Sequence, residues 1–304
     1  MSKLVPLKGG GRPPKPTYAM TILFDGIASG LLLFLISVGL SVTLGLMNFV
    51  NLAHGAFAML GGYVCVVLLN RLGVPFLLTL PIVALVSAAV GVVLERLLYR
   101  RLYGAAHLDQ VLFSIGLVFV SISSAHFLFG SQQQPLKLPP SLSGQFHVGS
   151  ADLGVYRVLL IVIGLSLAVA LQWLIAKTRF GATLRAAVDN PRAARGLGLD
   201  VDRVFVLTFA LGSGLAGLGG ALGVEMLGLD PEFPAKYIVY FLIVVAVGGR
   251  CNISGSLYAS LLLGICDVAG KYFVPQIGAF VIYAVMIVTL IFKPEGLFGK
   301  GAAK

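Results

Sequence analysis

Long apolar stretches recur along the whole chain, and short polar segments separate them. An α-helix needs about 20 residues to cross the roughly 30 Å of hydrocarbon in a bilayer. The stretches are continuously apolar rather than alternating, which favours helices over the strands of a membrane barrel. The candidate membrane helices are Gly26–Leu46, Ala53–Leu69, Pro75–Leu94, Val111–Phe129, Val155–Ala176, Val204–Leu227, Tyr237–Val247, Ser256–Tyr272 and Gln276–Phe292.

Two of these segments have unusual features that predict breaks. Asn48–Gly62 mixes polar residues and glycines, and Tyr237–Val247 is short and precedes a Gly-rich stretch. Broken helices expose backbone groups that must face protein or water, and in transporters they often line the pathway. The possible pathway residues are Asn48, Asn51, His54 and Gly55. For Asn51 and His54, a structural hydrogen bond at the break is an equal alternative.

Composition supports a membrane protein. Hydrophobic residues make up 58% of the 304 residues and charged residues 11%, against about 25% charged residues in soluble domains. The net charge of +10 comes from Lys and Arg in short loops beside apolar segments, which is typical of a membrane protein rather than of one that binds nucleic acid. We therefore predict an all-α polytopic integral membrane protein of roughly eight transmembrane helices, with one or two broken or re-entrant segments.

The basic residues predict the orientation, because cytoplasmic loops are enriched in Lys and Arg. Residues 177–203 carry six basic residues, whereas the loop 131–154 carries only Lys137, so the first is expected inside and the second outside. The predicted organisation is a cytoplasmic tail over 1–20, a transmembrane domain over 21–293 with the cytoplasmic loop 177–203, and a cytoplasmic tail over 294–304. If every candidate segment crossed, residues 1–20 would lie outside, so one early segment is expected not to cross.

No residue pattern predicts catalysis or cofactor binding by this chain. There is no GxxxxGK[ST] nucleotide loop, no Ser-His-Asp arrangement and no HExxH motif. Cys65, Cys251 and Cys266 lack the spacing of metal ligands, so no metal site is expected.

The inside segment 178–209 contains local signals for a short helix. Asn190 and Pro191 suit a helix start, and Gly198 suits a left-handed cap after Arg192–Leu197. Ala193 and Ala194 would give this helix a slim face for docking into a partner's groove. A solvated linker is an equal alternative from these residues alone.

Three stretches together resemble the branched-chain amino acid permeases, the membrane subunits of ATP-binding-cassette (ABC) importers. They are RFGATLRAAVDNPRAARGLGLDVDRVFVLTFALGSGLAGLGGAL at 179–222, GLSVTLGLMNFVNLAHGAFAMLGGYV at 39–64 and VVAVGGRCNISGSLYASLLLGI at 244–265, and PEGLFG at 294–299 is similar to that family's ending. The resemblance covers both halves of the chain in order.

The resemblance implies that the inside loop seats on an ATP-binding subunit and transmits its closure. The family's Glu-Ala-Ala-x-x-x-Gly coupling motif falls on Arg192, Ala193, Ala194 and Gly198, with Arg192 in place of the glutamate. We include Arg185, Asp189 and Asn190 in the expected coupling site. The implied partners are a second homologous permease subunit, two cytoplasmic ATP-binding subunits that bind ATP, a periplasmic substrate-binding protein and the lipid bilayer.

The implied function is the permease of a bacterial inner-membrane importer for branched-chain or other hydrophobic amino acids. Urea or short amides are the alternative substrates, and the sequence does not choose between a homodimer and a heterodimer of permeases. An ion-coupled secondary transporter that uses acids such as Asp267 is an alternative from another class, as is a structural scaffold. Small residues four apart in 212–223 predict close helix packing. Glu225 is expected at the interface, and an ion pair with Lys271 is one of two readings for Asp267.

Overall fold

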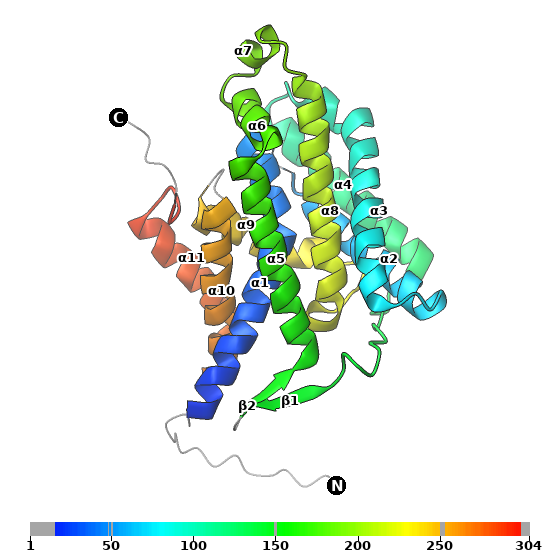
Figure 1. The fold of residues 1–304 in the computed structure, drawn as a ribbon, viewed down its shortest axis with the longest axis vertical. Helices are drawn as coiled ribbons and strands as arrows, with labels where there is room; N and C mark the ends of the chain where they lie inside the picture. The colour runs from blue at the N-terminus through cyan, green and yellow to red at the C-terminus, as the bar shows by residue number, and fades with distance from the viewer. Residues whose placement is uncertain (1–15, 48, 50, 149–150, 250–252, 299–304) are drawn as a thin grey trace.

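The computed structural model describes residues 16–47, 49, 51–148, 151–249 and 253–298, and they form a bundle of α-helices with one small β-hairpin (Figure 1). The helices are α1 Pro16–Met47, α2 His54–Val66, α3 Phe76–Leu97, α4 His107–Phe129, α5 Val155–Lys177, α6 Arg179–Asp189, α7 Pro191–Gly196, α8 Val201–Leu227, α9 Phe233–Gly248, α10 Ile253–Phe273 and α11 Val281–Phe292. The strands are β1 Gln145–Val148 and β2 Ala151–Gly154, and the short turns are η1 Val67–Arg71, η2 Tyr99–Leu102 and η3 Gly278–Phe280.

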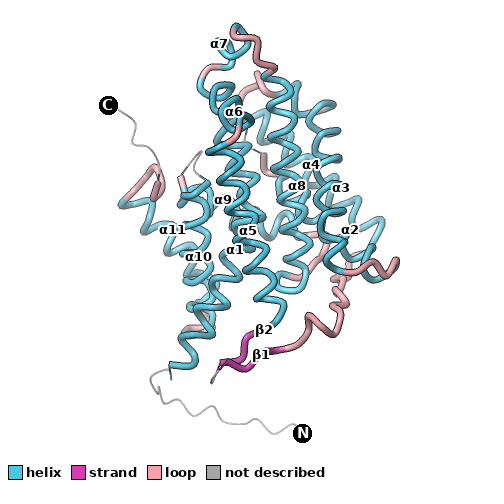
Figure 2. The backbone as a smooth tube through the Cα atoms, in the orientation of Figure 1, coloured by secondary structure: helices cyan, strands magenta, loops and turns pink. Residues whose placement is uncertain are grey.

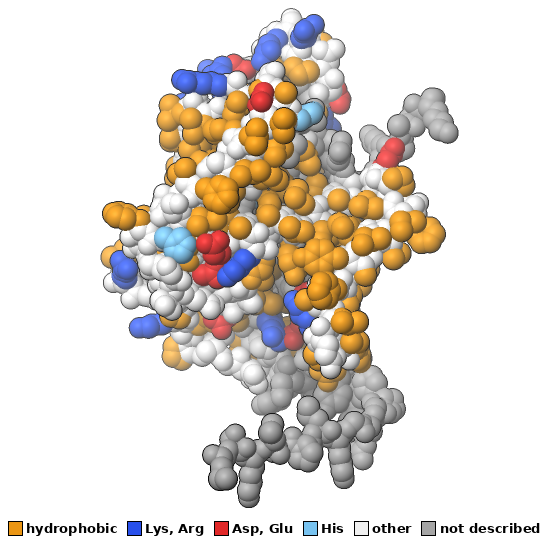
Figure 3. Space-filling model, turned by 180° about the vertical axis from the view of Figure 1, so that it is seen from behind, with side chains coloured by type: hydrophobic (Ala, Val, Ile, Leu, Met, Phe, Trp, Pro, Cys, Tyr) orange, Lys and Arg blue, Asp and Glu red, His pale blue; other side chains and the backbone are white. Residues whose placement is uncertain are grey.

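Six described helices are long and apolar enough to cross a membrane: α1, α3, α4, α5, α8 and α10. Helices α1 and α8 form the centre, since 83% and 61% of their apolar windows are buried, against 17% for α4. The outer helices expose large apolar side chains such as Leu85 and Val169, which suit contact with lipid. Hydrophobic side chains accordingly cover much of the rear face, with Lys and Arg gathered at its upper end (Figure 3). The chain is an all-α, multi-pass membrane protein.

The two ends of the bundle carry different elements. Helices α6 and α7 lie at one end, and the hairpin lies at the other (Figures 1 and 2). The strands pair antiparallel, with Gln145 opposite Gly154. The start of α1 lies at the hairpin end, where Asp25 accepts a hydrogen bond of 2.5 Å from Arg157 at the start of α5.

The described part of the predicted segment 1–20 lies away from the loop 177–203. Residues 16–20 lie at the end of the bundle opposite to 177–203, whereas the prediction places both on one side. The reason is that α2 does not return to the end that carries α7: it runs antiparallel to α1, through η1, to the hairpin end, where Asn70 Nδ2 donates to the carbonyl of Pro135 at 2.8 Å. Residues 1–15 and 299–304 of the predicted tails lie outside the described residues.

The break after α1 is real but shorter than predicted. α1 ends at Met47 and α2 begins at His54, whose Nε2 lies 2.8 Å from the carbonyl oxygen of Ile36 in the middle of α1. Between them the chain runs back into the bundle, and Phe49, Asn51 and Ala53 are buried. Non-helical backbone at this depth is tolerated because protein surrounds it.

The rest of the predicted break, from residue 54 to residue 62, is helical. Its glycines allow close packing rather than interruption: a Cβ on Gly61 would lie 2.0 Å from the carbonyl oxygen of Gly217 in α8. The second predicted break follows α9, which begins four residues before Tyr237 and ends at Gly248. Gly249 has φ +89, α10 begins at Ile253, and residues 250–252, including Cys251, lie outside the described residues.

Candidate functional site

The segment at the end of the bundle opposite the hairpin contains two helices where the sequence predicted one. α6 begins after Thr178, whose Oγ1 accepts a hydrogen bond from the backbone N–H of Gly181 at 3.3 Å. Its buried residues, Gly181, Leu184 and Ala187, follow helical spacing, so α6 is amphipathic and packs on the bundle. It therefore forms a firm base for the shorter α7.

The local signals for α7 are confirmed. Asn190 Oδ1 accepts a hydrogen bond from the backbone N–H of Ala193 at 3.0 Å, and Pro191 occupies the first turn. α7 ends at Gly196, one residue before the predicted end, and Gly198 adopts φ +81. A left-handed residue here turns the chain into α8.

The two alanines of α7 do not share one outward face, which corrects the predicted slim surface. Ala194 is 2% exposed and belongs to an apolar cluster with Leu184, Ala187, Val201 and Val204. Ala193 is exposed, and so are Arg192 and Leu197, the last at 81%. The outward surface at α7 therefore includes Arg192, Ala193 and the following Leu197. Ala194 anchors the helix by packing against α6 and α8.

Sequence reasoning missed Leu197, although a signal was present. A large apolar residue next to a capping glycine, in an otherwise polar segment, suits a contact with another protein. The other predicted coupling residues lie on α6 and its end. Asp189 and Asn190 are exposed, whereas Arg185 donates a hydrogen bond to the carbonyl of Ile175 and so ties α6 to α5.

Asp202, in the first turn of α8, joins α7 to the loop after α3. Its Oδ1 lies 3.1 Å from Arg195 Nη2 of α7, and its Oδ2 pairs with Arg100 of η2. Asp202 is part-exposed, so each pair by itself contributes little stability. Their importance lies in connecting three elements that are far apart in sequence.

Asn51 and His54 hold the helix break together. Asn51 Oδ1 accepts hydrogen bonds from the backbone N–H of Ala53 at 3.1 Å and from Tyr99 Oη at 2.9 Å. His54 is 1% exposed and bonds to Ile36 as described above. Both residues thus form hydrogen bonds at the helix break, which was one of the two predicted alternatives. The other alternative, that they line the substrate pathway, stays a prediction. Asn48 lies outside the described residues.

Gly55 has a packing role at the start of α2. A Cβ at this position would lie 3.0 Å from the Cα of Pro234 in α9. The glycine therefore lets α2 approach α9 closely.

An apolar pocket of about 210 Å³ lies beside the break, between α2, α3 and α4. Ala53 and Ala56 line it, together with Leu60, Leu94 and Leu117. Ala53 is fully buried, and Ala56 is partly exposed.

These positions test whether the break borders an aqueous path. In a variant whose three native cysteines are replaced by serine, we expect Ala56→Cys to react with a small charged thiol reagent and Ala53→Cys to be protected, because Ala56 is partly exposed and Ala53 is fully buried. Protection of both residues from both sides of the membrane would contradict an aqueous path here.

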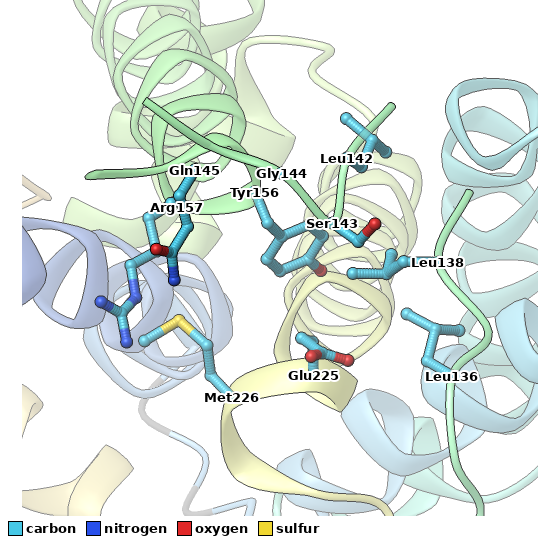
Figure 4. Close-up of a pocket in the computed structure, with 11 residues that line it drawn as sticks. Leu136, Leu138, Leu142, Ser143, Gly144, Gln145, Tyr156, Arg157, Glu225 and Met226 are labelled. Atoms are coloured by element: carbon cyan, nitrogen blue, oxygen red, sulfur yellow. The ribbon is translucent and has the colours of Figure 1, made fainter. Parts of the chain in front are cut away.

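A second pocket, of about 520 Å³, opens at the hairpin end (Figure 4). Its lining combines aliphatic residues such as Leu136 and Leu138 with the charged side chains of Arg157 and Glu225. Figure 4 shows the Glu225 carboxylate beside the Tyr156 ring and Leu138. Glu225 is exposed, as an interfacial position requires.

Asp267 forms the ion pair that was one reading of the sequence. Its Oδ2 lies 2.6 Å from Lys271 Nζ, one helical turn along α10. This contact gives the acid inside the apolar segment a charged partner.

Comparison with known proteins gives consistent matches along the chain. A profile of the family described as branched-chain amino acid transport system, permease component, matches residues 22–290. The permease protein BraD of Pseudomonas aeruginosa, named for high-affinity branched-chain amino acid transport, is 26% identical over 94% of this chain and 98% of its own length. A probable branched-chain amino acid transport permease, LivH of Methanocaldococcus jannaschii, is 30% identical over 91% of this chain and 92% of its own length.

A permease of a second type also matches. LivM of Salmonella typhimurium, a high-affinity branched-chain amino acid transport permease, is 26% identical over 86% of this chain and 67% of its own length. No solved structure matches.

Proposed function

We propose that this chain, which belongs to the family of permease components of branched-chain amino acid transport systems, carries branched-chain or other hydrophobic amino acids across the bacterial inner membrane. It is the membrane-spanning permease subunit of an ABC importer. A periplasmic binding protein delivers the substrate, and ATP bound to two cytoplasmic subunits drives the transport.

The observation that supports this proposal most strongly is the exposed surface of α7. α7 stands at the tip of the bundle (Figure 1), is capped at its start by Asn190 and is anchored by Ala194. Arg192 and Ala193 of this helix and the following Leu197 are exposed. A rigid, protruding helix suits insertion into a partner's groove. The sequence contains no GxxxxGK[ST] loop, which supports ATP hydrolysis on a separate subunit.

A second permease completes the membrane part of the proposed importer. The chain is similar to permeases named LivH and, at lower coverage, to one named LivM. We infer that it pairs with a homologous subunit. In this complex the α7 helix of each permease docks on its own ATP-binding subunit.

This function predicts a strict need for ATP. The permease, its homologous partner and the binding protein, reconstituted in vesicles, should concentrate leucine only when the ATP-binding subunits and ATP are present. Uptake of radiolabelled leucine measures this, with labelled urea as the control for the alternative substrate class. Concentrative uptake driven by an ion gradient alone would contradict the proposal, and ATP-driven uptake of urea but not leucine would change the substrate.

A further inference from the structure

We propose that the η2 turn, Tyr99–Leu102, transmits the movement of α7 to the helix break before α2. This inference rests on the proposed function, because it assigns the internal route by which closure of the ATP-binding subunits reaches the membrane interior. It makes Tyr99, Asn51 and Asp202 positioning residues for transport. Two sets of contacts and one observation on buried polar atoms support it.

The first set connects α7 to the turn. Asp202 uses one carboxylate oxygen for Arg195 of α7 and the other for Arg100 of η2. A displacement of α7 by a bound ATP-binding subunit therefore acts on the carboxylate that also holds Arg100. Both pairs are part-exposed, so the shared carboxylate couples the two elements through geometry rather than through a large energy.

The second set connects the turn to the break. Tyr99 is adjacent to Arg100, is fully buried, and donates its hydroxyl hydrogen to Asn51 Oδ1 at 2.9 Å. Its ring meets that of Phe49 edge to face, with centroids 5.2 Å apart. Both Phe49 and Asn51 belong to the non-helical segment, so Tyr99 contacts the break through packing and through a hydrogen bond.

The third observation concerns buried polar atoms beside the turn and the break. Asn51 Nδ2 and Glu95 Oε2 are buried and have no hydrogen-bond partner among the described residues. Glu95 neighbours the same turn, since Tyr103 Oη donates to its Oε1 at 2.8 Å. Buried polar atoms without partners are rare and unfavourable. A rearrangement of the break that pairs these atoms gives the turn a second state toward which α7 can drive it.

The proposal is tested with Tyr99→Phe in the complete transporter. This change removes one hydroxyl and keeps the ring packing. We expect normal membrane abundance and normal co-purification of the ATP-binding subunits, but about fivefold less leucine transported per ATP hydrolysed, because the loss of one buried hydrogen bond changes an equilibrium by about that factor. Stimulation of ATP hydrolysis by the loaded binding protein should fall with it.

The matched control is Tyr63→Phe in α2. Tyr63 is also buried and stacked on an aromatic ring, Phe129, but its hydroxyl has no hydrogen-bond partner among the described residues. This variant should transport as the wild type does. Asp202→Asn, at a part-exposed position, should also uncouple transport, and the double variant with Tyr99→Phe should be no worse than the stronger single variant, because both act on one route.

The outcomes separate this inference from the proposed function. Wild-type transport that requires ATP, together with an unchanged transport ratio in Tyr99→Phe and Asp202→Asn, would overturn the inference and leave the function standing. Independent, additive losses in the double variant would also overturn it. If wild-type protein with all its partners shows no ATP-driven uptake, the proposed function itself fails.

Discussion

Ala193→Glu should leave the protein at normal abundance in the membrane and reduce leucine uptake by more than about tenfold. Ala193 is exposed on α7, so glutamate fits the isolated chain without strain. In a docked complex the same side chain would carry an unpaired charge into a protein groove, which costs about 2 kcal/mol or more, equivalent to a loss of binding above tenfold. The measurements are membrane abundance, co-purification of the ATP-binding subunit and uptake.

Two neighbouring alanines provide matched controls for this prediction. Ala194→Glu places the charge in the apolar cluster under α7. It should therefore lower the abundance of the protein in the membrane, and not only its binding to the ATP-binding subunit. Ala186→Glu adds the same charge to an exposed position of α6 and should have little effect. Normal co-purification and normal uptake in Ala193→Glu would show that α7 is only a linker.

Gly198→Val should produce a milder loss of the same kind. Nothing lies within 4 Å of a Cβ at this glycine, so the side chain has space, but φ +81 is strained for a β-branched residue. A left-handed backbone costs an ordinary residue about 1–2 kcal/mol, which is enough to displace α7 without unfolding the bundle. Co-purification that is weakened but measurable, at normal abundance, is the expected result.

The parts of the fold that depend on neighbouring residues could be predicted from the sequence. Apolar segment length located the long helices, because bilayer thickness imposes a minimum on each crossing. The start of α7 was predictable because Asn190 and Pro191 act within one helical turn, and so was the cap at Gly198. The break before α2 was located by its polar residues, but its end was not.

The glycines of α2 explain that error. Glycine inside a helix is usually unfavourable, so residues 55–62 were interpreted as part of the break. In the structure Gly55 and Gly61 meet the backbones of α9 and α8, and Gly62 meets the side chains of Leu229 and Val224; this packing depends on positions more than 100 residues away. The end of the bundle at which residues 16–20 lie could not be predicted for a related reason: the rule for basic residues and the count of crossings disagree, and the position of α1 depends on the assembled bundle.

The contacts that define the candidate site were largely unpredictable for the same physical reason. Tyr99 and Asn51 are 48 positions apart, and Arg100 and Asp202 are 102 apart. No local pattern relates such residues, because they meet only after the helices assemble. The different roles of Ala193 and Ala194 likewise depend on which side of α7 faces α6, and a six-residue helix has too few positions to reveal an apolar face.

Gly220→Ala should destabilise the bundle strongly although it adds only one methyl group. The new Cβ would lie 1.9 Å from the carbonyl oxygen of Ala58, and because that atom belongs to the α2 backbone it cannot rotate away. α8 is a central helix, so the displacement spreads to its neighbours. Overpacking typically costs about 1–3 kcal/mol, and a contact with rigid backbone belongs at the upper end of that range.

Gly116→Ala is the matched control, because it makes the same change in α4 where nothing lies within 4 Å of the new Cβ. Alanine is preferred over glycine in a helix by about 0.5–1 kcal/mol, so this variant should be as stable as the wild type or slightly more so. The thermal unfolding midpoint in detergent and the abundance in the membrane measure both effects. An unfolding midpoint for Gly220→Ala equal to that of Gly116→Ala would mean that α2 and α8 can separate without cost. The glycines of α8 would then have to be explained by helix movement during transport rather than by close packing.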